Sequence, residues 1–342
     1  MDTPTPDTLE QNLAHLRRQD EHSLRGFEPH YKNIVDYILR ITHRIWEEGD
    51  LGYIYDSYLG NVSVHTGYGT TYGVEEVVSS SVAFAAAVPD RRIYAKDVLW
   101  TGDDERGFHT SHLLVSKGTN TGYSPWAPPT GRRIELLAVA NCFVRENRVI
   151  EEWLVRDTAA MVRQLGLDLW EVARDAAALW PVSVTGETDR LQGQYPPAAY
   201  QPQDQAEPHE DLIRQLFHDV WNARHFNRVT ERYAEDSSLH VPNHLTLRGV
   251  ANIRAYHLNF VAMFPDAHMS VEHVYGSEDS DGYRAAVRWR FSGTHARYGW
   301  YGKPTHKRVN ILGISHLHIV NEEIKEHFMV FDDLAVAMQL VG

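Results

Sequence analysis

The sequence has little of what several protein classes require. Its single cysteine, Cys142, excludes an internal disulfide and a Cys-x-x-Cys site. No stretch approaches about 18 uninterrupted apolar residues, and the first residues lack a basic segment followed by an apolar run. We therefore expect neither a membrane helix nor a signal peptide, and a soluble, cytoplasmic protein.

Positive charge is also scarce. The chain has 33 Lys and Arg against 46 Asp and Glu, for a formal net charge of −13. Phosphate binding requires a net basic face, and no cluster of Lys and Arg stands out. We expect no nucleic-acid partner.

What the chain does have is length and an internal repeat. Its 342 residues, 43% apolar and 23% charged, suffice for two globular domains. Residues 118–133 read GTNTGYSPWAPPTGRR and residues 293–308 read GTHARYGWYGKPTHKR. The two segments align without a gap and share six positions, but His295 stands where the first has Asn120.

The repeat extends over most of the chain at an offset of 175 residues. Matching positions are Trp46 with Trp221, His65 with His240, Asp157 with Asp332, and Gln164-Leu165 with Gln339-Leu340. The pairs Pro89-Asp90 and Pro265-Asp266 match at an offset of 176, which indicates a one-residue slip of the kind that surface loops tolerate.

Composition sets the expected domain boundaries. Residues 182–208 are rich in Pro, Gln and Gly and lack periodic apolar positions, which is typical of a linker. We predict an N-terminal extension over residues 1–29, a first and divergent copy over 30–180, a linker over 181–208 and a second copy over 209–342.

Each copy begins with helices and continues with strands. Ile34, Ile38, Ile41 and Ile45 recur at helical spacing in the first copy, and Leu212, Leu216 and Val220 do so in the second. Three β-rich runs then follow, separated by turn residues. This order predicts an α+β fold in which helices pack on an antiparallel sheet.

These residues resemble a known family. A helix-borne Trp, a strand-borne His, Phe-Pro-Asp, Gly-Thr-His, Gly-x-Pro-Thr and a closing Asp followed by Gln-Leu are similar to the SnoaL-like polyketide cyclases of the NTF2-like superfamily, which also holds ketosteroid isomerase. The resemblance implies two tandem cone-shaped barrels, each a curved, mostly antiparallel sheet wrapped on helices around an apolar cavity. It also implies aldol-type ring closure without a metal or an organic cofactor.

The resemblance assigns roles to particular residues of the second copy. The acid/base Asp of the last strand maps to Asp332, and the polarising His maps to His295, with His240 and His316 as secondary hydrogen-bonding candidates. A carboxylate and an imidazole together can remove a proton next to a carbonyl and stabilise the resulting oxyanion. An alternative remains open for Asp332, because Asp is also a favoured cap for the helix that follows.

The first copy departs from this pattern. Asn120 can donate a hydrogen bond to an oxyanion but cannot transfer a proton. A possible second site there consists of Asp157, His65, Asn120 and His112.

The leading hypothesis is an enzyme that performs cofactor-free acid/base chemistry on a small hydrophobic carbonyl compound, by aldol cyclisation, isomerisation or dehydration. One alternative is a non-catalytic module for small-molecule binding or assembly. Another is a metal-dependent hydrolase, suggested by the histidines of the second copy. We expect the copies to pair as an intramolecular pseudo-dimer, present as a monomer or as a homodimer of such pairs.

Overall fold

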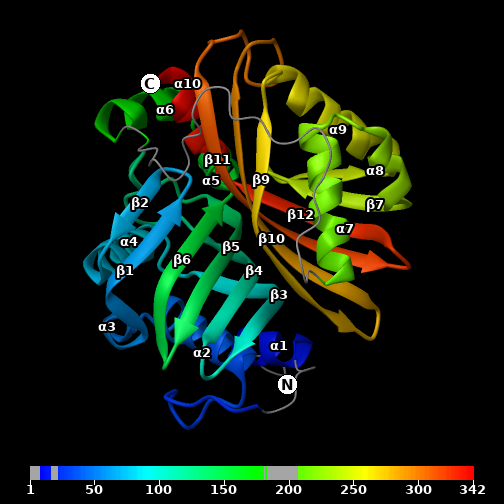
Figure 1. Cartoon of the computed structure of the whole chain (residues 1–342). Helices are drawn as coiled ribbons and strands as arrows, with labels where there is room; N and C mark the ends of the chain where they lie inside the picture. Colours follow the sequence, from blue (N-terminus) through cyan, green and yellow to red (C-terminus); the bar gives the residue numbers. More distant parts are fainter. Residues whose placement is uncertain (1–7, 17–21, 181, 183–206) are drawn as a thin grey trace, which may run out of the picture. The chain divides into compact units, whose positions relative to one another are not determined.

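The computed structural model describes residues 8–16, 22–180, 182 and 207–342. Each sequence repeat contributes one run of helices and strands (Figure 1). The elements up to residue 180 are α1 (Thr8–His15), α2 (Ile34–Trp46), η1 (Leu51–Tyr53), α3 (Ile54–Ser57), β1 (Tyr58–Thr66), β2 (Gly69–Tyr72), α4 (Val74–Ala87), β3 (Arg92–Asp103), β4 (Gly107–Thr119), β5 (Arg133–Arg145), β6 (Arg148–Arg156), α5 (Thr158–Gln164) and α6 (Leu169–Leu179).

The second repeat follows the same order. Its elements are α7 (Pro208–Phe217), η2 (His218–Asn222), α8 (Asn227–Arg232), β7 (Tyr233–Val241), β8 (Leu245–Arg248), α9 (Val250–Met263), β9 (His268–Asp279), β10 (Gly282–Thr294), β11 (Arg308–Val320), β12 (Glu323–Phe331) and α10 (Asp333–Val341). The η2 segment is a π-helical turn that continues α7.

The described strands form two six-stranded sheets with the same topology. Their orders are β2-β1-β6-β5-β4-β3 and β8-β7-β12-β11-β10-β9. In each sheet the first long strand pairs parallel with the last one, β1 with β6 and β7 with β12, and the neighbours from β3 to β5 and from β9 to β12 pair antiparallel. The predicted α+β class with two tandem copies is confirmed; the sheets are open, so the expected barrels are not closed among the described strands.

The chain folds into two compact units whose limits differ from those of the sequence repeats. Among the described residues, unit 1 comprises 8–16, 22–66, 70–154 and 161–167, and unit 2 comprises 67–69, 155–160, 168–180, 182 and 207–342. Unit 2 therefore includes the β1–β2 turn, the end of β6 and helix α6 from the first repeat. The linker predicted over 181–208 lies, except for residues 182, 207 and 208, outside the described residues.

Local sequence signals explain the first long helix of each repeat. Asn33 caps α2, because its side chain accepts a hydrogen bond from the Asp36 N–H. The isoleucines predicted to form the apolar face of this helix are all buried, as the periodicity required; they are Ile34, Ile38, Ile41 and Ile45. In unit 2, α7 buries Ile213, Leu216 and Phe217 and packs on β9.

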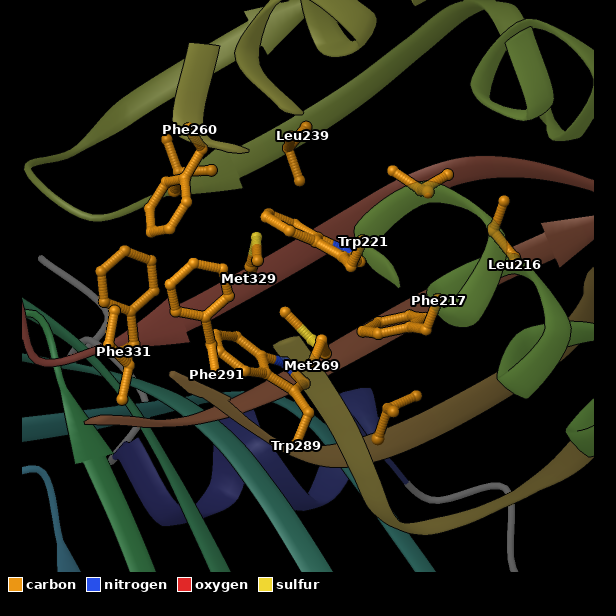
Figure 2. Close-up of a cluster of buried hydrophobic side chains, with 14 of the residues drawn as sticks. Leu216, Phe217, Trp221, Leu239, Phe260, Met269, Trp289, Phe291, Met329 and Phe331 are labelled. Carbon is orange, nitrogen blue, oxygen red and sulfur yellow. The ribbon is translucent and has the colours of Figure 1, made fainter. Parts of the chain in front are cut away.

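The interior of unit 2 is filled by large side chains from the inner face of its sheet and from its helices. Figure 2 shows Trp221, Phe291 and Met329 in this cluster. Trp289 lies across Gly313 of the neighbouring strand, and a β-carbon at Gly313 would lie 2.1 Å from Trp289 Cζ2. Glycine is thus needed there for the indole to lie against the sheet.

No helix in the described part of the chain is both long and apolar enough to span a membrane.

We expect Gly313→Ala to lower the free energy of unfolding by about 1–3 kcal/mol, because the added methyl group overlaps the Trp289 ring in a packed interior. Urea unfolding followed by circular dichroism measures the effect. Gly60→Ala is the control, since its added β-carbon meets no atom within 4 Å. Equal stabilities of the two variants would contradict this packing.

Candidate functional site

Asp332, the acid/base candidate of the second repeat, is buried at the junction of β12 and α10. Its Oδ1 accepts hydrogen bonds from the backbone N–H groups of Leu334 and Ala335 at 3.2 and 3.4 Å. Its Oδ2 accepts a hydrogen bond from the Thr158 hydroxyl at 2.5 Å. Burial raises the pKa of Asp332 to about 7, although hydrogen bonds from Thr158 and Tyr68 oppose the shift. The helix-cap interpretation is confirmed, and a catalytic role for Asp332 stays a prediction.

Two further buried carboxyl groups lie in the same part of unit 2. The Asp157 carboxylate accepts hydrogen bonds from the backbone N–H groups of Asn243 and His244 at 2.9 and 3.1 Å. Asp333 accepts one from the Tyr301 hydroxyl at 2.6 Å. Burial raises the pKa of Asp157. We name this group the carboxyl cluster: Asp157, Asp332 and Asp333.

His295 follows the last residue of β10 and is fully buried. Its Nδ1 lies 3.3 Å from both the backbone N and the hydroxyl oxygen of Thr305. A backbone N–H can only donate, so Nδ1 is the acceptor and the neutral ring carries its proton on Nε2. Burial lowers the pKa of His295, and the Arg297 backbone opposes this shift. Nε2 itself makes no well-formed hydrogen bond among the described residues.

Asn120 holds the equivalent loop of the first repeat in the same way. Its Oδ1 accepts hydrogen bonds from the Thr130 N–H and hydroxyl, both at 2.9 Å. Its Nδ2 donates to the carbonyl oxygens of Ala87 and Gly122 at 3.1 and 2.8 Å. Asn120 and His295 therefore both hold their loop through a hydrogen bond with a threonine, which we call the loop clamp. His295 adds a buried Nε2–H in the second repeat.

The secondary candidates of the second repeat lie on the outer face of its sheet. His240 stacks on Phe328 with ring centres 4.2 Å apart, and its Nε2 lies 3.1 Å from Glu326 Oε1. His316 is buried and pairs with Phe328 in register, while its neighbours Ser315 and Leu317 face inward. The structure therefore does not bring these two histidines to the face that holds the core.

The first-repeat candidates also separate. His65 stacks on Trp153 and hydrogen-bonds with Thr70 and Glu151 at 2.9 and 2.8 Å, as His240 does on its own sheet. His112 is buried on β4, four residues after Phe108 of the unit 1 core and therefore on the same face of the strand.

A polar chain that the sequence did not single out crosses the inner face of the unit 2 sheet. Tyr233 Oη lies 2.7 Å from His327 Nδ1, and His327 Nε2 lies 2.9 Å from Ser315 Oγ. Ser315 Oγ also accepts a hydrogen bond from Trp289 Nε1 at 3.0 Å. All four side chains are buried. We name this group the inner chain. The side of the sheet on which His327 lies follows from the register of β12 against β7 and β11.

The surroundings of the inner chain keep it neutral. Burial lowers the pKa of His327 well below its ordinary value, and His257 and His240 add to the shift. Burial likewise raises the pKa of Tyr233. Phe217 lies against His327 with ring centres 6.3 Å apart. The inner chain therefore lies in an apolar interior that disfavours the charged forms of His327 and Tyr233.

An open pocket of about 520 Å³ lies at one end of unit 2. Tyr283 and Ile319, two residues of the core, belong to its wall. The His209 ring stacks on Tyr283 with ring centres 4.2 Å apart. The remaining lining is polar: Glu278, Ser280, Asp281, Asn321 and Glu322, with Gly282 and Val320.

Within the described residues, no group of three or more His, Cys, Asp or Glu side chains is arranged to hold a metal ion.

Comparison with known proteins gives one family match. The sequence model of the family described as SnoaL-like polyketide cyclase matches residues 37–165 and 211–340. The search of curated proteins finds no match.

Solved structures similar to the chain each cover about one repeat. IdmH of Streptomyces antibioticus, named as a candidate polyketide cyclase, is 25% identical and covers 39% of this chain and 97% of its own, with a TM-score of 0.34. TsrD of Streptomyces laurentii is 17% identical, with coverages of 39% and 94% and a TM-score of 0.34. A protein of ketosteroid isomerase-like fold from Catenulispora acidiphila is 14% identical, with coverages of 40% and 96% and a TM-score of 0.33.

The raised pKa of Asp332 predicts a pH dependence of stability. Between its ordinary value near 3.8 and about 7, the folded state holds a proton that the unfolded state has released. The free energy of unfolding therefore falls as pH rises through this range and levels off above it. Asp332→Asn keeps a capping oxygen and removes the titration, so we expect a smaller fall in urea unfolding measured from pH 4 to pH 8.

Asp168→Asn is the matched control. Asp168 caps α6 through the N–H groups of Trp170 and Glu171 but is exposed. Parallel stability curves for the two variants would show that Asp332 does not titrate in this range.

Proposed function

Because the chain belongs to the SnoaL-like polyketide cyclase family, we propose that it is a cyclase-type enzyme that moves protons on a small hydrophobic carbonyl compound. We place the reaction on the inner face of the second-repeat sheet. The observation that carries this proposal is the inner chain, in which Tyr233, His327 and Ser315 form a continuous hydrogen-bonded path inside an apolar interior.

The inner chain has two proton arrangements with the same heavy-atom contacts. In one, Ser315 donates to His327 Nε2 and His327 Nδ1–H donates to Tyr233. In the other, Tyr233 donates to Nδ1 and Nε2–H donates to Ser315. Either arrangement leaves one hydroxyl proton, on Tyr233 or on Ser315, available to a third group. A proton taken up at one end is thus matched by a proton released at the other.

This property suits an aldol ring closure. The carbon that attacks loses a proton, its electron pair forms the new carbon–carbon bond, and the oxygen of the attacked carbonyl gains a proton. Ser315 Oγ accepts the proton from carbon as it passes its own to His327, and Tyr233 donates the proton that the oxygen receives. No metal or organic cofactor is needed for this balance.

The lowered pKa of His327 supports a relay rather than a stored charge. An imidazolium is disfavoured by burial, so the ring accepts one proton while it releases the other. The raised pKa of Tyr233 disfavours a tyrosinate in the same way. A concerted transfer keeps both groups neutral.

We propose the pocket at the end of unit 2 as the entrance for the substrate, beside Tyr283. Ile319 lines it, and Leu317 and Ser315 follow on the same face of β11. Ser315 lies four residues from Ile319, or about 13 Å along the strand. His327 pairs with Leu317 and lies between the two.

Asp332 and His295 are the competing assignment. Both are buried, and His295 carries its proton on Nε2, which makes no well-formed hydrogen bond among the described residues. However, the oxygens of Asp332 serve the cap of α10 and Thr158, and His295 clamps its loop through Thr305. These bonds give each side chain a structural role, so we place them second to the inner chain.

We expect His327→Gln to lower the turnover of β-diketone, β-keto ester and polyketide-like substrates by about 10²-fold or more, because glutamine cannot relay a proton. Product formation followed by absorbance and mass spectrometry measures this. Tyr233→Phe and Ser315→Ala interrupt the path at its two ends and should each lower turnover without loss of the folded state.

His240→Gln is the matched control on the outer face of the same sheet. Equal turnover in His327→Gln and His240→Gln would refute the inner chain. Loss in Asp332→Asn and in His295→Asn, where asparagine reproduces the loop clamp of the first repeat, would assign the chemistry to the competing pair instead. Retention of a ligand without turnover of any substrate would favour the non-catalytic binding module.

A further inference from the structure

The first repeat buries a carboxyl group at the position that corresponds to His327. Glu152 lies on β6 at the same offset of 175 residues at which Tyr58 corresponds to Tyr233. Tyr58 donates a hydrogen bond to Glu152 Oε2 at 3.2 Å. Glu152 is 5% exposed and Tyr58 is 2% exposed. Both repeats thus pair a tyrosine with an ionisable group on the inner face of the sheet.

The strand register places Glu152 and His327 at equivalent positions of the two sheets. Each belongs to a row of paired residues across neighbouring strands, which we call a rung. His327 pairs with Leu239 and Leu317, and Leu317 pairs in turn with Ala285. Glu152 pairs with Val64. In the next strands of the same sheet, Cys142 pairs with Thr110 at the positions that correspond to Leu317 and Ala285.

The rung in unit 1 is the more polar of the two, although its surroundings are apolar. Val64 and Cys142 belong to the unit 1 core. Burial, and then the charge of Glu152, raises the pKa of the Cys142 thiol, which therefore stays neutral. A buried carboxyl group on the inner face is unfavourable relative to an apolar side chain unless its partners compensate. Glu151, its neighbour in sequence, lies on the outer face and pairs with His65.

We propose that unit 1 holds a second acid/base centre, in which Glu152 is the base and Tyr58 the hydrogen-bond donor, acting on an enolisable carbonyl compound. This inference rests on the proposed function and extends it to the first repeat. Glu152 removes a proton from the carbon next to the carbonyl. The electron pair of the C–H bond forms a carbon–carbon double bond, and the carbonyl oxygen takes the charge beside the Tyr58 hydroxyl. The proton on Glu152 then returns to carbon or to oxygen of the product.

The two centres have different chemistry. Ser315 corresponds to Ala140 in the first repeat, so unit 1 lacks the serine end of the inner chain. A carboxylate can hold the proton between two steps, whereas the neutral inner chain must deliver it at once. The first centre therefore suits enolisation and double-bond migration.

The test is the exchange of the α-protons of a simple β-keto ester in D₂O, followed by NMR with the full chain. We expect His327→Gln to keep measurable exchange. Adding Glu152→Gln should lower the remaining rate by about 10²-fold, as expected for loss of a general base. Adding Glu151→Gln instead should leave it unchanged. Adding Tyr58→Phe, which preserves the carboxylate, should lower kcat without abolishing exchange. Circular dichroism confirms that each variant is folded.

The outcomes separate this inference from the proposed function. If His327→Gln alone removes all exchange, unit 1 holds no such centre and the inner chain stands. If Glu152→Gln and Glu151→Gln behave alike, the unit 1 centre is overturned, and the effect of His327→Gln alone decides whether the inner chain stands. If Glu152→Gln removes exchange in the otherwise unaltered chain while His327→Gln does not, the unit 1 centre stands and the inner chain fails. If the unaltered chain gives no exchange above buffer, both proposals are overturned.

Discussion

The parallel pairing of the first long strand with the last one is the constraint on which both candidate centres depend. It joins β7 to β12 and β1 to β6 within otherwise antiparallel sheets. Tyr233 begins β7 and His327 lies on β12, 94 residues later, yet their side chains are in contact. Tyr58 and Glu152 meet across the same pairing, again 94 residues apart.

Successive side chains of the last strand, β6 or β12, face opposite sides of the sheet. Residues that hold the sheet together therefore alternate with residues of the two proposed centres. On the outer face, His65 hydrogen-bonds with Thr70 and Glu151, and His240 does the same with Thr246 and Glu326. This arrangement is the same in both repeats, as expected for hydrogen bonds that stabilise the sheet. On the inner face the residues differ, with Glu152 in one repeat and His327 in the other.

Sequence alone could predict the features that depend on local periodicity. The repeat, the α+β class and the buried face of α2 follow from spacing within short windows. The cap made by Asp332 is also a local signal. Its Thr158 partner is 174 residues away and could not have been found without the fold. The inner chain was missed for the same reason, because assigning His327 to the inner face requires the register of β12 against β7 and β11.

The difference between Asn120 and His295 has two possible physical reasons, a chemical role for the histidine and the need to hold the loop that follows. Sequence reasoning took it as a chemical difference between the copies. Both side chains accept hydrogen bonds from the threonine ten residues later and hold the same loop, so the position is under a structural constraint in both repeats. An imidazole satisfies that constraint with Nδ1 alone, and its Nε2–H makes no well-formed hydrogen bond among the described residues. Asn120 has no comparable donor to spare, because its Nδ2 donates to two carbonyl groups. At this loop position, a chemical role is therefore compatible with holding the loop only for His295 of the second repeat. On the inner face of the sheet, by contrast, each repeat has an ionisable group, Glu152 in the first and His327 in the second.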